Sequence, residues 1–123
     1  MVEPYCSPVS GFAYRFGHHE GADLRADPFS GEAQSTDRPL DANNALATLI
    51  FWRHLRRFQL THPDLEVVEA HRFATLIYPL SGGFTGRRLV PYAARSALRA
   101  VERRLQPLAG ALAFRCLVVL ERR

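Results

Sequence analysis

The sequence contains no lysine, so all sixteen of its basic side chains are arginines. This uniform choice indicates a coding bias and predicts no particular chemistry. Cysteine is nearly as rare: Cys6 and Cys116 are the two present, and they lie far apart in dissimilar settings. This spacing excludes a disulfide framework and a four-ligand zinc site, and it predicts two free thiols.

Long apolar runs are missing as well. The run Leu46–Trp52 is interrupted by Thr48 and is followed by Arg53. Because a bilayer-spanning helix needs about 20 apolar residues, we expect no membrane segment. The first residues include Glu3 and have no basic region leading into an apolar core, so we expect no secretion signal and a cytoplasmic location.

Charge is unevenly distributed along the 123 residues. Residues 1–50 hold three arginines against seven acids, whereas residues 51–123 hold thirteen against five. A basic half can attract nucleic acid, but these arginines are spread over two predicted helices and two strand ends without exposed aromatic residues between them. Nucleic acid is therefore an unlikely partner. With 47% apolar residues, the chain has the composition of one folded domain.

The first 40 residues form the loop-rich part of this domain. Pro4 and Pro8 predict a loop or the tail of a strand over Val2–Ser10. The segment Gly11–Glu20 is compatible with a short helix or an extended stretch. Asp23–Leu40, rich in Gly, Ser, Asp and Pro, predicts a long surface loop.

A helix is predicted over Ala42–Leu60, after Asp41 as its N-cap. One face of this helix is apolar, and it ends at His62-Pro63. The residues at helical spacing on that face are Ala45, Leu49, Trp52, Leu55 and Phe58.

The β-forming residues that follow predict a strand over Arg72–Tyr78, with a shorter one at Val67 and Val68. The glycines of Pro79–Gly83 then predict a turn.

Pro91 suits the first turn of a second helix. The apolar stripe of this helix reaches Leu105, and Pro107 and Gly110 are expected to end it. A final strand over Leu112–Leu120 is apolar on both faces, so it belongs inside a sheet with cover on each side.

The order of elements over residues 41–123, helix, strand, helix, strand, predicts an α/β fold with two main antiparallel strands and two main helices. These elements supply only part of the cover that the last strand needs. We therefore expect residues 1–123 to form a single partial domain.

Four segments resemble, in order, the class I S-adenosylmethionine-dependent methyltransferases. Val2-Glu3-Pro4-Tyr5 with Ser7-Pro8 is similar to the end of their fifth strand, and Tyr14–Glu20 to a segment after the following loop. Tyr78–Phe84 resembles the turn after their sixth strand, and Ala113–Arg122 their closing strand. The resemblance implies a Rossmann-like sheet of seven strands, the last running antiparallel between the fifth and the sixth.

The family's cofactor site has no counterpart in this sequence. Its glycine-rich turn after the first strand and the acid that holds the ribose are missing, and Gly82-Gly83 comes too late in the chain. The resemblance thus implies the C-terminal, acceptor-side portion of an enzyme that uses S-adenosylmethionine and a small-molecule methyl acceptor. We expect this chain alone to bind no cofactor and to be inactive.

Residues after the fifth strand are the candidates for contact with the acceptor. His18, His19 and Glu20 are the candidate catalytic residues, because a histidine can accept a proton near neutral pH while a neighbouring carboxylate orients it. A pair of partly exposed loop histidines is the alternative. Metal binding by this triplet is less favoured, because adjacent ligands seldom reach one ion without a third group.

Tyr5 and Tyr14 are candidates for an aromatic acceptor pocket, although aromatics at such spacing are more often core. Cys6 with a histidine as base is a remote candidate for a nucleophile. Ser81-Gly82-Gly83 forms either a set of backbone donors for a ligand or a plain tight turn.

A second hypothesis is a non-catalytic interaction module. An exposed sheet edge of such a module would pair with a protein partner or with another copy of the chain.

Overall fold

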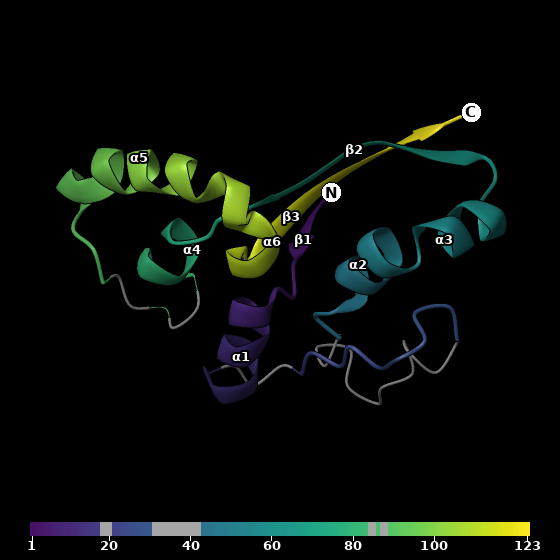
Figure 1. Cartoon of the computed structure of the whole chain (residues 1–123), viewed down its shortest axis with the longest axis horizontal. Helices are drawn as coiled ribbons and strands as arrows, with labels where there is room; N and C mark the ends of the chain where they lie inside the picture. Colours follow the sequence, from purple (N-terminus) through teal and green to yellow (C-terminus); the bar gives the residue numbers. More distant parts are fainter. Residues whose placement is uncertain (18–20, 31–42, 84–85, 87–88) are drawn as a thin grey trace.

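In the computed structural model a three-stranded antiparallel sheet organises the chain, with the strands in the order β1-β3-β2 (Figure 1). β1 is Val2–Pro4, β2 is Leu65–Phe73 and β3 is Arg115–Arg122. β3 pairs antiparallel with both neighbours, so β1 and β2 run parallel to each other on either side of it. The structure describes residues 1–17, 21–30, 43–83, 86 and 89–123.

The central place of β3 follows from its composition. Cys116 and Val118 are fully buried on one face, and Leu117 and Val119 are half-buried on the other. A strand that is apolar on both faces is stable only inside a sheet, so its predicted position is confirmed. The antiparallel pairing of the two long strands is confirmed too, although β3 begins at Arg115 and not at Leu112.

The predicted strand Arg72–Tyr78 is wrong in its bounds. β2 begins at Leu65, includes the short strand predicted at Val67 and Val68, and ends at Phe73. The reason is Ala74, whose φ of 58° is left-handed and turns the chain out of the extended conformation. The Ala74 carbonyl then accepts a hydrogen bond from the Phe114 N–H at 3.3 Å.

The helix predicted over Ala42–Leu60 is interrupted. Its described part consists of α2 (Leu46–Thr48), the π-helical η2 (Leu49–Arg53) and α3 (Leu55–Thr61). The His54 N–H donates to the Leu49 carbonyl at 2.8 Å, five residues back, which is the wider π-type turn. α3 ends before His62 and Pro63, as predicted.

The short-helix alternative for Gly11–Glu20 is correct for its described part, because α1 spans Pro8–Gly17. The Ser10 N–H donates to the Ser7 hydroxyl at 3.0 Å, and the Ser7 N–H donates to the Ser10 hydroxyl at 2.8 Å. This reciprocal pair caps the helix start. Residues 23–30 are the described part of the predicted loop, and they contain no helix or strand.

Short helices connect β2 to β3. They are α4 (Ile77–Leu80), η3 (Tyr92–Ala94), α5 (Arg95–Leu105), η4 (Gln106–Leu108) and α6 (Ala109–Leu112). Pro107 does not end the helical segment as predicted. It lies in the first turn of η4, where its missing N–H costs nothing, and α6 follows directly.

The core lies on one face of the sheet, between β3 and the segment α2–α3. Phe51 and Phe58 form an edge-on pair there and pack against the face of Cys116 and Val118. α4 and α5 lie toward the other end of the long β2–β3 pair (Figure 1). No helix in the described part of the chain is long and apolar enough to cross a membrane.

Candidate functional site

Tyr5 and Tyr14, the candidate site residues that the structure describes, lie at one end of the sheet. β1 and β2 are parallel, so their carboxyl ends lie at the same end of the sheet, where β3 begins. The chain leaves β1 there toward α1, and it leaves β2 there toward α4. Ligands of open α/β sheets bind outside the carboxyl ends of parallel strands, which makes this end the candidate site.

His18, His19 and Glu20, the candidate catalytic residues, lie outside the described residues. α1 ends at Gly17, directly before them. Their arrangement therefore stays a prediction.

Tyr5 is 6% exposed and packs inside the protein. Its ring meets Trp52 edge-on at 5.1 Å, and the Arg72 guanidinium lies 5.4 Å from its centre. A side chain at Gly110 would meet the Arg72 guanidinium at 2.7 Å, so the glycine leaves room for it. Burial raises the pKa of the Tyr5 phenol, and Arg72 partly offsets this effect.

Tyr14 is 4% exposed, and it shares a backbone hydrogen-bond acceptor with Tyr5. The Phe114 carbonyl accepts the Tyr5 N–H at 2.9 Å and the Tyr14 hydroxyl at 3.5 Å. The structure thus brings the two tyrosines to the same end of the sheet. Their rings contact protein side chains, and their burial fits the packing role that the sequence left open beside acceptor binding.

Cys6 is poorly suited to nucleophilic chemistry. Burial raises the pKa of its thiol to about 11, so the thiol is protonated near neutral pH, whereas a nucleophile must be a thiolate. Its Sγ donates to the Asn44 carbonyl at 3.6 Å. Cys116 is also a free, buried thiol, as the cysteine count predicted.

The segment Ser81–Gly83 is a tight turn. The Ser81 N–H donates to the Ile77 carbonyl at 2.8 Å and the Gly83 N–H to the Tyr78 carbonyl at 3.0 Å, so these two donors are used within the turn. A side chain at Gly83 would collide with the ring and carbonyl of Tyr78. Gly83 is thus needed for the position of Tyr78.

A groove of about 900 Å³ opens between β1–β3–β2 and α5 at this end of the sheet. We call it the arginine groove. Its apolar wall comes from β1, the end of β2 and α4, and comprises Val2, Phe73, Ala74, Ile77 and Tyr78.

The polar wall of the arginine groove comes mainly from α5. Arg99, Glu102 and Arg103 line it there, and Arg115 lines it from the start of β3. Glu102 accepts a weak hydrogen bond from the Leu76 N–H at 3.4 Å. Three guanidinium groups against one carboxylate leave the groove positively charged.

Arg115 joins the two walls. Its Nη2 donates to the Tyr78 hydroxyl at 2.8 Å, and its guanidinium carbon lies 4.4 Å from the centre of the same ring. The sequence does not reveal this groove directly, because its arginines lie on separate predicted elements. The signal that points to it is the spacing of Arg99 and Arg103, four residues apart on one helix.

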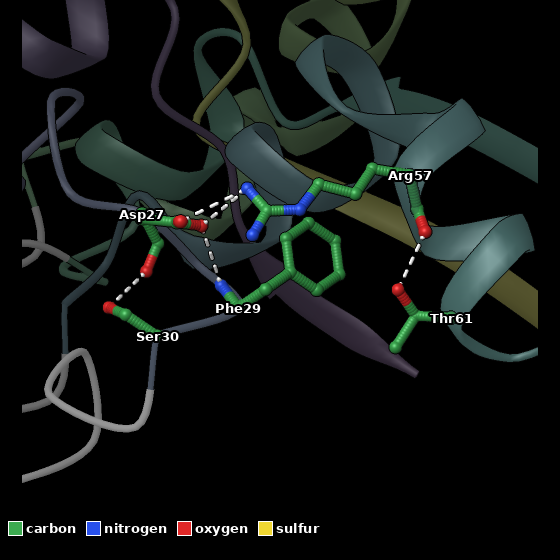
Figure 2. A network of polar contacts seen from close by, with 5 residues as sticks. All are labelled: Asp27, Phe29, Ser30, Arg57 and Thr61. Atoms are coloured by element: carbon green, nitrogen blue, oxygen red, sulfur yellow. Dashed lines mark hydrogen bonds and ion pairs between the residues drawn. The ribbon is translucent and has the colours of Figure 1, made fainter.

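The loop of residues 21–30 is fixed on α3 at another part of the molecule (Figure 2). The Arg57 guanidinium contacts both oxygens of the Asp27 carboxylate, at 2.9 and 3.0 Å, and lies 4.7 Å from the centre of the Phe29 ring. The hydrogen bond from the Phe29 N–H is the largest cause of the lowered pKa of Asp27, and Arg57 lowers this pKa further. The pair is exposed, so its role is to position the loop.

The resemblance places the family's cofactor contacts, a glycine-rich turn and an acid, after its first and second strands. The described strands β1 and β2 are followed by Tyr5 and Cys6 and by Ala74 and Thr75, so neither leads directly into a glycine-rich turn. The described residues also contain no cluster of three metal-ligating side chains.

Comparison of the chain with protein-family models, with curated proteins and with solved structures gave no match.

Proposed function

We propose that this chain is the acceptor-side, C-terminal portion of a class I S-adenosylmethionine-dependent methyltransferase-like protein that acts on a small molecule. In this proposal the cofactor is bound by a glycine-rich half outside these 123 residues. The chain alone is then inactive.

The order and direction of the strands carry the proposal. The family's closing strand runs antiparallel between its fifth and sixth strands. Here β3 runs antiparallel between β1, whose end carries the resemblance to the fifth strand, and β2, which precedes the segment that resembles the turn after the sixth. β1 and β2, which are neighbours in sequence, do not pair with each other, so a simple β-meander does not account for this order.

The position of the candidate residues adds support. Tyr5, Tyr14 and Tyr78 gather around Phe114 at the carboxyl ends of β1 and β2, the end at which open α/β sheets bind ligands. In methyl transfer the protein chiefly positions the acceptor and removes its proton. His18, His19 and Glu20 remain the candidates for the proton transfer, and Tyr5 and Tyr14 the candidates for a wall around the acceptor.

The experiment compares two polypeptides. The first is this chain, and the second is the chain extended by whatever open reading frame precedes its first codon. Calorimetric titration with S-adenosylmethionine and with its demethylated product should give micromolar binding to the extended polypeptide and none to the chain alone. Clear binding by the chain alone would overturn the proposal that a separate half binds the cofactor. Binding by neither polypeptide would overturn the proposed family.

The second candidate is the interaction module that pairs through a sheet edge. β1 favours it, because no strand among the described residues pairs with its outer edge. Met1 and Val118 bond through both backbone groups, so the backbone groups of Val2 and Pro4 point to the open side. Pro4 has no N–H, which leaves this edge short of one donor.

Light scattering after size-exclusion chromatography distinguishes the two candidates. The module predicts dimers or larger species of the chain alone, and a clean monomer argues against it.

A further inference from the structure

The positive charge of the arginine groove is only partly balanced among the described residues, because Glu102 is the single acid against three arginines. Arg95, Arg99 and Arg103 follow one another at intervals of four residues on α5, so they lie along one face of the helix. Like charges at this spacing repel and destabilise a helix. Among the described residues neither Arg99 nor Arg103 has an ion-pair partner.

Arg115, at the start of β3, adds a third positive charge to the groove. Its guanidinium is held by Tyr78 and by no carboxylate in the described part of the chain. The groove therefore brings together cations from a helix and from a strand, which are far apart in the sequence. Glu102 is the single acid that lines it.

The facing wall is apolar and open. Val2 is 55% exposed and Phe73 is 36% exposed, and the ring of Tyr78 continues the same wall. Exposed apolar surface beside a concentration of charge marks a binding site for a ligand with both characters. A volume of about 900 Å³ admits a ring-sized organic molecule.

We propose that the arginine groove binds a small organic anion. Its ring-sized apolar body lies against Val2, Phe73 and Tyr78, and its carboxylate, sulfonate or phosphate lies between Arg99 and Arg103. Guanidinium groups bind such anions through paired hydrogen bonds. This proposal stands independently of methyl transfer, because it rests on the charge and shape of the groove alone.

A nucleic acid fits this groove less well. Nucleic-acid sites track repeated phosphates along an extended basic surface, and they stack bases on aromatic residues beside it. Here the cations line one wall of a single groove, and the facing wall is mainly aliphatic and aromatic carbon.

The test uses a pair of fluorescent probes that share an aromatic body. Anilinonaphthalene sulfonate carries the anion, and N-phenylnaphthylamine lacks it. The variant Arg99→Gln/Arg103→Gln removes two cations of the groove. The control Arg56→Gln/Arg104→Gln removes two exposed arginines that do not line it.

The sulfonate should bind at one site per chain, and the groove variant should weaken this binding roughly tenfold, the effect of one to two charge-assisted contacts. The control variant should leave it unchanged, and neither variant should affect the neutral probe. Rising sodium chloride should weaken binding of the sulfonate to the unmodified chain but not of the neutral probe. This measurement tests the proposal without any substitution.

Three results would overturn the proposal: no saturable binding of the sulfonate, equal losses in the groove and control variants, or equal affinity for the two probes. Displacement of the sulfonate by a short RNA, with an affinity that rises with RNA length, would also overturn it in favour of a nucleic-acid surface.

Discussion

The hydroxyl of Thr48 accepts a hydrogen bond from the backbone N–H of Cys6 at 2.8 Å, and both residues are buried. The contact joins α2 to the segment between β1 and α1, which lie 42 residues apart in the sequence. Thr75 is equally buried, but its hydroxyl has no partner among the described residues. These two threonines allow a matched experiment.

Thr48→Val should lower the free energy of unfolding by about 1–3 kcal/mol, because it leaves the buried Cys6 N–H without an acceptor. Thr75→Val should leave stability unchanged or raise it, because it removes a polar atom that makes no bond. Urea denaturation measures both. Equal losses would show that the two hydroxyls have the same role.

A pair of leucines tests the position of the core. Leu49 in η2 is 1% exposed and Leu60 in α3 is 75% exposed. Leu49→Ala should therefore destabilise the protein by about 2–5 kcal/mol, since it leaves a cavity in the core. Leu60→Ala should change stability by less than about 0.5 kcal/mol. Similar midpoints of urea denaturation for the two variants would contradict the observed burial.

The left-handed conformation of Ala74, directly after β2, predicts that substitution by glycine has different effects on stability at two alanines. Ala74→Gly relieves a conformation that costs an alanine about 1–2 kcal/mol, so stability should stay level or rise. Ala70→Gly lies inside β2, where glycine has only an entropic cost, and it should destabilise by about 0.5–1 kcal/mol. A loss in Ala74→Gly as large as that in Ala70→Gly, measured by thermal unfolding, would argue against the turn at Ala74.

The two buried thiols predict a loss of stability in alkali. Burial raises the pKa of Cys6 and of Cys116 from 9.0 to about 11. Between these values the unfolded chain has already lost the thiol protons that the folded chain keeps, so stability falls as the pH rises. The slope is about 1.4 kcal/mol per pH unit for each thiol.

Urea denaturation between pH 9 and 10 tests this slope, since the pKa of Tyr5 is raised from 10.0 and adds the same trend only at higher pH. The variant Cys6→Ala/Cys116→Ala should show a much flatter pH dependence. A slope that persists in this variant would place its origin elsewhere.

The contact between Asp27 and Arg57 predicts that removal of the arginine returns the pKa of Asp27 only part of the way to its ordinary value. The Phe29 N–H is the main cause of the lowered pKa of Asp27, and Arg57 is the second. Arg57→Gln should raise the pKa of Asp27 but leave it below its ordinary value, whereas Arg56→Gln should not change it. The pKa of Asp27 is lowered in the folded protein. The contact therefore holds the loop at pH values above the ordinary pKa of an aspartate, and it is lost as the pH falls through the lowered pKa.

The pH dependence of the Phe29 amide resonance in NMR spectra measures this pKa. A full return to the ordinary value in Arg57→Gln would show that the arginine, and not the backbone amide, is the main cause.

Local pattern was sufficient for some elements and misleading for others. The apolar residues on both faces of Leu112–Leu120 correctly predicted a strand inside the sheet, because burial on two faces is a property of the segment itself. Ile77 and Tyr78 have high β-propensity, yet they are the first two residues of the helix α4. Their state depends on the left-handed turn at Ala74, which the pattern of side chains does not reveal.

The candidate site divides in the same way. The sequence identified Tyr5 and Tyr14 as aromatic residues near the end of a strand, but only the structure shows that both reach the Phe114 carbonyl. The arginine groove needs Val2, Phe73, Arg99 and Arg115, which come from four elements. No spacing in the sequence brings these four together.

The sequence by itself determined the α/β class, the central place of the last strand and two free thiols, because each depends on the composition of one segment or on a count. Only the tertiary structure decided where β2 ends, how η2 interrupts the long helix and which arginines share a groove. These features depend on contacts between distant residues, such as Arg115 with Tyr78 and Phe114 with Ala74. Such contacts form only when the strands have paired, and their energies then override the local preferences of the chain.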